Sequence, residues 1–143
     1  MSFLPSWLIW SLFSALFAAA TAILAKVGVK GIDSNLATAV RTTVILVFTW
    51  AIAIALGRHN AIRQISPRAW LFLALSGIAT GLSWLCYFRA LQLGEASRVA
   101  PIDKLSVVLV ILFAAVFLGE SLTPLKLLGG ALIAGGAALL AFA

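Results

Sequence analysis

Five long apolar stretches, separated by short polar segments, account for nearly the whole chain. They run over about residues 7–29, 35–56, 69–93, 98–119 and 125–142. A helix needs about 20 mainly apolar residues to cross the hydrocarbon core of a bilayer, and each stretch is close to that length. Because the stretches are long, non-alternating and rich in Ala and Leu, we expect helices rather than strands. The pattern predicts an all-α, polytopic membrane protein with five transmembrane helices.

The polar segments between these stretches carry the signals that start and stop helices. Gly28 is suited to the end of the first helix, and Ser66-Pro67 and Thr123-Pro124 each place a capping hydroxyl before a proline. The longest polar segment, residues 57–68, is too short for a soluble domain. The first 25 residues have no charged side chain, unlike the basic start of a signal peptide, so we expect that helix to be retained. We therefore predict one membrane domain over residues 1–143.

The composition supports a membrane protein and argues against several other classes. Hydrophobic residues make up 64% of the chain and charged residues 10%, whereas soluble domains carry about 25% charged residues. The net charge is +6, but Lys and Arg are scattered singly between apolar runs, so no nucleic-acid partner is expected. No spacing of His, Cys or carboxylates suggests a metal or other cofactor. Neither a Ser/His pair nor an HExxH motif indicates an enzyme.

The Lys and Arg residues outside the helix interiors divide evenly between the two membrane faces. One face would carry Arg58, Arg63, Arg68 and Lys126, and the other Lys26, Lys30, Arg89 and Arg98. An excess of Lys and Arg normally fixes the orientation of a membrane protein. The even division has two interpretations: the expected helix boundaries are slightly displaced, or the chain inserts in both orientations. In the second case it would pair with itself as an antiparallel homodimer.

The charged residues that lie deepest inside the predicted helices are Arg41, Asp103 and Lys104. Arg41 is about two turns inside the second helix, roughly 10 Å from its start at 1.5 Å per residue. Asp103 and Lys104 follow Pro101 in the fourth helix, where the proline removes a backbone donor and favours irregular backbone. A charge at membrane depth is a functional hypothesis by default. The alternative is that Arg41 and Lys104 extend to the headgroups and that Asp103 is a favourable carboxylate near a helix start.

Two aromatic residues and a lysine complete the candidate site. Trp84 and Tyr87 share one face of the third helix, where they would either line a cavity or pack in the core. Lys26, near the end of the first helix, is equally well explained by a side chain that reaches the headgroups. The candidate substrate-binding residues are thus Lys26, Arg41, Trp84, Tyr87, Asp103 and Lys104. Their net positive charge favours an anionic or zwitterionic small molecule.

Several segments of the chain resemble the EamA-type transporters of the drug/metabolite transporter superfamily. Residues 87–106 resemble the junction between the third and fourth helices of that family. Residues 118–123 and the glycine-rich run 128–136 resemble the end of the same domain, and residues 25–28 and 41–43 resemble its first two helices. The resemblance extends over nearly the whole chain, and the order and spacing of these segments make it specific.

The resemblance implies a fold and a function. Typical members have ten helices, arranged as two five-helix repeats of opposite topology around a central substrate site. This chain would be one repeat, half of an inverted-repeat transporter, which favours completion as an antiparallel homodimer. The function implied is secondary transport of a small metabolite or drug-like solute by alternating access. The location would be the lipid bilayer of the plasma membrane or bacterial inner membrane.

Two alternatives to this function remain. The chain could be a half-transporter that needs a different partner, or a membrane interaction subunit that transports nothing. Small multidrug exporters of the same superfamily use a glutamate in the first helix. Because the first predicted helix here contains no acid, that mechanism is not transferred.

Overall fold

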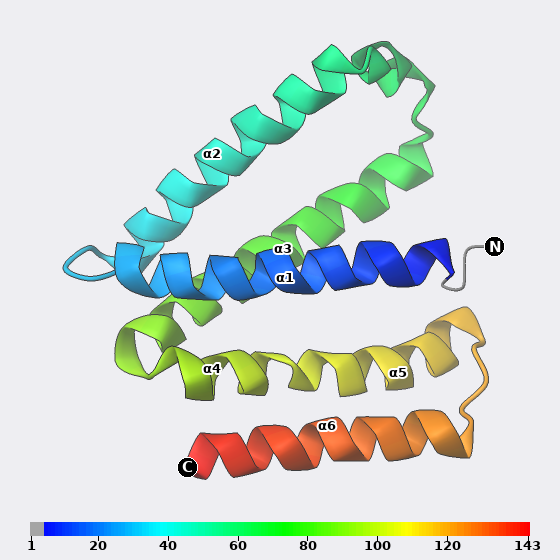
Figure 1. Cartoon of the computed structure of the whole chain (residues 1–143). Helices are drawn as coiled ribbons and strands as arrows, with labels where there is room; N and C mark the ends of the chain where they lie inside the picture. Colours follow the sequence, from blue (N-terminus) through cyan, green and yellow to red (C-terminus); the bar gives the residue numbers. More distant parts are fainter. Residues whose placement is uncertain (1–4) are drawn as a thin grey trace. The chain divides into compact units, whose positions relative to one another are not determined.

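The computed structural model describes residues 5–143, and all of its regular structure is helical (Figure 1). The elements are α1 (Ser6–Gly28), α2 (Ser34–Ala55), the short 3-10 helix η1 (Arg58–Gln64), α3 (Pro67–Leu93), α4 (Ala96–Asp103), α5 (Leu105–Leu118) and α6 (Pro124–Phe142). Residues 1–4, where the predicted domain would begin, lie outside the described residues, and the single domain over residues 1–143 stays a prediction.

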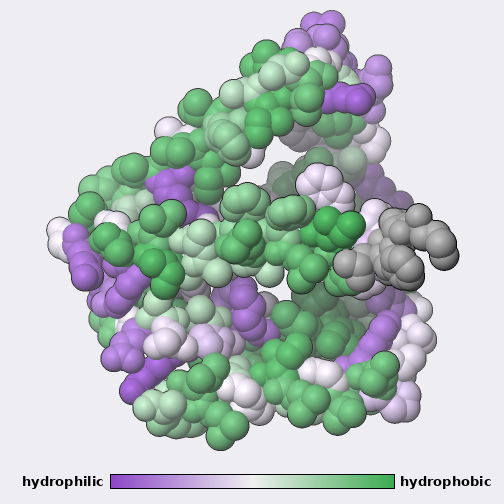
Figure 2. Space-filling view, in the orientation of Figure 1, coloured by the Kyte–Doolittle hydropathy of each residue, from purple (hydrophilic) through white to green (hydrophobic). Residues whose placement is uncertain are grey.

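Five helical segments within the described residues are long and apolar enough to cross a membrane. They are α1, α2, α3, the continuous stretch Ala96–Leu118 that contains α4 and α5, and α6. In Figure 2, hydrophobic side chains cover most of the visible helix surface, and hydrophilic ones gather largely at turns and helix ends. Large apolar side chains such as Phe117 and Leu125 are more than three-quarters exposed, which suits contact with lipid. The predicted class, an all-α polytopic membrane protein, is confirmed.

The fourth spanning segment is two helices rather than the single helix expected at about residues 98–119. Pro101 lies inside α4 and has no N–H group to donate. The N–H of Lys104 then bonds the carbonyl of Pro101 at 3.1 Å, and that of Val107 bonds the carbonyl of Lys104 at 3.0 Å. Both bonds join residues three apart, which tightens the backbone into a turn. The segment is irregular, as expected, and the break lies at Lys104, between α4 and α5, three residues after Pro101.

The chain forms two compact units. Val27–Gln92 form the first, called here the α2–α3 unit, which includes η1. The second, called the α1/α4–α6 unit, joins the described residues up to Lys26 with Leu93–Ala143.

In the α2–α3 unit, the ends of the long helices are fixed by side chains. The carboxylate of Asp33 accepts hydrogen bonds of 2.9 and 3.0 Å from two N–H groups in the first turn of α2. The hydroxyl of Ser66 accepts from the N–H of Ala69 at 3.2 Å, so the predicted Ser-Pro cap of α3 is confirmed. At the other end of α3, the side-chain amide of Gln92 donates to the carbonyls of Val29 and Ile32. These last bonds hold the turn before α2 against the end of α3.

In the α1/α4–α6 unit, α6 packs against both α4 and α5. Gly130 on α6 faces Ile111 on α5, and a Cβ at this position would make an ordinary van der Waals contact of 3.6 Å with the Ile111 side chain. The hydroxyl of Thr123 accepts from the N–H of Lys126 at 3.3 Å, which confirms the predicted cap of α6. The ammonium of Lys26 donates to the carbonyl of Gly94 at 2.6 Å and so ties α1 to the turn that precedes α4.

Candidate functional site

Arg41 bridges from α2 to two aromatic rings on α3. Its guanidinium carbon lies 4.2 Å from the centre of the Trp84 ring and 5.4 Å from the centre of the Phe88 ring. Both distances fall within the range of about 6 Å in which a cation is attracted to an aromatic face. Trp84 and Phe88 are four residues apart, so they project from the same side of α3. The two rings hold the guanidinium at a defined place along the membrane-spanning part of α2.

The charge of Arg41 is not matched by an acid. Its Nη1 atom is buried and has no hydrogen-bond partner within residues 5–143. None of the three ion pairs in the described part of the chain includes it. The α2–α3 unit contains one acidic residue, Asp33, whose carboxylate caps the start of α2. Aromatic faces attract the positive charge but do not satisfy every N–H group, so Arg41 retains donors for a planar anion such as a carboxylate.

Polar residues continue from Arg41 along the same face of α2. Ser34 and Thr38 are buried, with 3% and 5% of their surface exposed, and with Arg41 they follow the spacing of one helix face. The Thr38 hydroxyl donates to the carbonyl of Ser34, and the Thr42 hydroxyl to the carbonyl of Thr38, both at 2.8 Å. These two threonine hydroxyls thus donate within the helix, and the Nη1 atom of Arg41 has no hydrogen-bond partner among the described residues.

Tyr87 is the third predicted site residue in this unit. It lies three residues after Trp84 on α3, is half-buried, and is within electrostatic range of the Arg41 guanidinium. Arg41, Trp84 and Tyr87 therefore lie together in the α2–α3 unit. Sequence reasoning missed Phe88, Ser34 and Thr38. The spacing of Phe88 from Trp84, and of Ser34 and Thr38 from Arg41, was the signal available to find them.

The other three predicted site residues belong to the α1/α4–α6 unit. Lys26 binds the carbonyl of Gly94 in the turn before α4. Lys104 and Asp103 form an ion pair at the break between α4 and α5, with 3.1 Å between the ammonium and a carboxylate oxygen. The six predicted residues are thus divided between two units, and their assembly into one substrate site stays a prediction.

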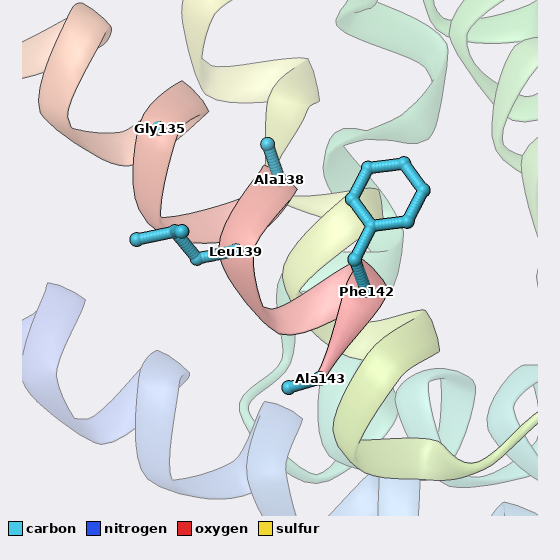
Figure 3. Close-up of a pocket in the computed structure, with 5 residues that line it drawn as sticks. All are labelled: Gly135, Ala138, Leu139, Phe142 and Ala143. Carbon is cyan, nitrogen blue, oxygen red and sulfur yellow. The ribbon is translucent and has the colours of Figure 1, made fainter.

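A shallow hollow lies along the last turns of α6 (Figure 3). It has a volume of about 540 Å³ and is lined by Gly135, Ala138, Leu139, Phe142 and Ala143. A site for a polar solute needs a few well-placed polar groups to orient the ligand, and these side chains supply none. The hollow is therefore not the candidate site.

For metals, residues 5–143 contain no group of three or more His, Cys, Asp or Glu side chains able to hold an ion.

Comparison with known proteins identifies the family. Residues 5–142 match the EamA-like transporter family. A curated relative from Sinorhizobium sp, named "Uncharacterized transporter in cobO 3'region", is 58% identical over 136 residues, which cover 95% of this chain and 96% of the relative. No solved structure gives a match. The family match includes the segments that carry the resemblance, so that prediction is confirmed, and the chain belongs to the EamA-like transporter family.

Proposed function

We propose that this protein is a secondary transporter that moves a small anionic or zwitterionic solute across the cell membrane, with Arg41 binding the anionic group. Membership of a transporter family and the name of the Sinorhizobium relative support the transporter role. The observation that carries the choice of solute is the Arg41 guanidinium, which lies in a spanning helix, faces Trp84, and has no acidic partner among the described residues.

Arg41 faces aromatic rings rather than an acid, and this favours an anionic solute over a cationic one. A charged side chain inside a membrane span is costly, and it normally pairs with another charge or faces a watery cavity. An incoming carboxylate would accept two parallel hydrogen bonds from the guanidinium fork and neutralise it. An organic cation would meet repulsion at the same place. Hydrogen bonds to charged groups contribute about 1.5–3 kcal/mol, which corresponds to about a 10- to 150-fold change in affinity.

We further propose that the transporter works by alternating access as an antiparallel homodimer. The even division of Lys and Arg between the two membrane faces supports insertion in both orientations. The resemblance implies two inverted five-helix repeats around one site, and two oppositely oriented copies would supply both. The break between α4 and α5 also supports this mechanism, since transporter sites are commonly built from interrupted helices.

The choice of solute is tested by binding to protein purified in detergent. A panel at pH 7 would contain sodium salts of monocarboxylates, dicarboxylates, amino acids and methanesulfonate, together with chlorides of organic amines. We expect anions to bind the wild type, and Arg41→Met to weaken that binding about 10-fold or more. Arg63→Met, which removes an exposed arginine of η1, is the matched control and should bind like the wild type. Equal affinities for wild type and Arg41→Met, or binding of amines alone, would overturn the assignment.

The homodimer is tested by the location of the C-terminus in cells. One fusion protein would carry a C-terminal reporter that is active only in the cytoplasm, and a second would carry a reporter that is active only outside. Activity from both fusions supports dual insertion and an antiparallel pair. Activity from one fusion alone refutes dual insertion and leaves either an oppositely oriented partner of a different sequence or a different architecture.

A further inference from the structure

The turn between α2 and α3 carries three arginines that no acid of the chain matches. Residues 57–68, which include η1, contain Arg58, Arg63 and Arg68 and neither Asp nor Glu. All three arginines are exposed. None of the three ion pairs among residues 5–143 includes one of them. These three arginines are called here the η1 surface.

The acids of the chain are all engaged elsewhere. The sequence contains four of them. The carboxylate of Asp33 caps the start of α2. Glu95, Asp103 and Glu120 each pair with an arginine or a lysine outside the η1 surface. The positive charge of the η1 surface is therefore balanced by anions from outside the chain.

The position of the η1 surface determines which anions it meets. By length and composition α2 and α3 both span the membrane, so the turn that joins them lies where the bilayer meets water. Trp50, near the end of α2, and Trp70, near the start of α3, are half-exposed, as in the aromatic belts of membrane interfaces. Figure 2 shows hydrophilic side chains gathered at this end of the α2–α3 unit. The arginines are thus placed at the level of the lipid headgroups.

The backbone keeps the three arginines in one short segment. Gly57, with φ +66°, ends α2, and its N–H bonds the carbonyl of Ile54 at 2.9 Å. η1 then packs against α2. In the first turn of α3, the guanidinium carbon of Arg68 lies 5.9 Å from the centre of the Phe72 ring, which holds this charge beside the helix start. The turn therefore presents its positive charge as one surface.

We propose that the η1 surface binds the phosphate groups of anionic phospholipids in the membrane that the helices span. The planar fork of a guanidinium matches a phosphate through two parallel hydrogen bonds. A zwitterionic headgroup carries its own cation beside the phosphate, and that cation is repelled by the arginines. An anionic headgroup has no such cation, so the arginines favour it. Each arginine near an anionic membrane surface strengthens binding about five-fold.

This surface is separate from the candidate solute site. Arg41 precedes the end of α2 at Ala55 by 14 residues, which is about 21 Å along the helix. Lipid affinity and solute affinity are therefore measured at different ends of the helix. If the lipid preference were absent, the assignment of Arg41 would stand, and if Arg41 did not bind the solute, the η1 surface would keep its lipid.

Lipid binding is measured by native mass spectrometry on the intact protein in detergent. The probes are phosphatidylglycerol, which is anionic, and phosphatidylcholine, which is zwitterionic, with identical acyl chains. We expect the wild type to bind phosphatidylglycerol at least about 10-fold more tightly than phosphatidylcholine. Arg58→Gln/Arg63→Gln should lower the affinity for phosphatidylglycerol about 10- to 30-fold and leave that for phosphatidylcholine unchanged. Arg58→Lys/Arg63→Lys keeps the charge and should retain most of the affinity.

The matched control removes the same charge from residues that already have acidic partners. Arg98→Gln/Lys126→Gln takes one cation from the pair with Glu95 and one from the pair with Glu120. It should change the affinity for phosphatidylglycerol by no more than about two-fold. Equal wild-type affinities for the two lipids, no loss in Arg58→Gln/Arg63→Gln, or an equal loss in the control would overturn the proposal.

Discussion

Gln92 gives a direct test of how the α2–α3 unit is held together. Its amide nitrogen donates to the carbonyl of Ile32 at 2.5 Å and more weakly to that of Val29 at 3.5 Å. Its amide oxygen accepts from the guanidinium of Arg89 at 3.0 Å, which fixes the orientation of the amide. The substitution Gln92→Leu keeps a side chain of similar size and removes all three bonds. The turn between α1 and α2 would then lose its tie to the end of α3.

The expected loss follows from the number and quality of these bonds. A hydrogen bond contributes a net 0.5–1.5 kcal/mol, and the long bond to Val29 and the exposed bond to Arg89 fall at the low end, so the total is about 1–2 kcal/mol. For a chain of this size that corresponds to a fall of about 3–8 °C in the unfolding temperature. Because the turn opens locally, amide exchange of residues 29–33 should also accelerate about 5- to 30-fold.

Both quantities can be measured on protein purified in detergent. Thermal unfolding followed by size-exclusion chromatography gives the temperature shift, and hydrogen–deuterium exchange gives the local effect. Gln64→Leu is the matched control, because Gln64 is an exposed glutamine at the end of η1. We expect this control to change neither quantity appreciably. If Gln92→Leu behaved like Gln64→Leu in both measurements, the bonds from Gln92 would not be what holds the turn.

Two further predictions each compare a pair of substitutions. Gly119 has φ +69° and open space around its Cβ position, so Gly119→Ala should destabilise through the backbone alone, by about 1–2 kcal/mol. Gly129→Ala, at a helical position with equally open space, should be neutral or stabilising. If both substitutions shifted the unfolding temperature in the same direction, this argument would be contradicted. Trp84→Ala should weaken methanesulfonate binding about 2- to 30-fold by releasing the Arg41 guanidinium, whereas Trp84→Phe should retain part of the attraction. Calorimetry showing unchanged affinity in Trp84→Ala would refute that role.

The helical spans were predictable because their signals are local. A long apolar run and a Ser-Pro or Thr-Pro pair are each contained in a short piece of chain, and the caps at Ser66 and Thr123 have the expected hydrogen bonds. Pro101 likewise indicated irregular backbone in the fourth segment. The break itself lies three residues later, at Lys104. There the N–H groups of Lys104 and Val107 each bond the carbonyl three residues earlier, and the sequence does not reveal this choice of partners.

The contacts across the α2–α3 unit were much harder to predict. Arg41 stands out in the sequence as a charge within an apolar run, but Phe88 is one of nine phenylalanines, and its four-residue spacing from Trp84 is the one local signal that marks it. That spacing does not reveal its partner, which becomes clear when α3 is placed opposite α2. Gln92 was missed for the same reason, since its carbonyl partners are 60 and 63 residues away along the chain.

The cations of the candidate site differ in what compensates their charge, and this difference separates their roles. The carbonyl bound by Lys26 cannot be protonated or displaced without opening a turn, so this contact is structural. The ammonium of Lys104 pairs with the carboxylate of Asp103 at 3.1 Å, so its charge is balanced within the chain. The aromatic rings beside Arg41 leave N–H donors unused, so this contact leaves room for a ligand. Removing Lys26 should therefore lower the stability of the protein, whereas removing Arg41 should weaken its affinity for the solute. A measurement of transport rate alone would not distinguish these two effects.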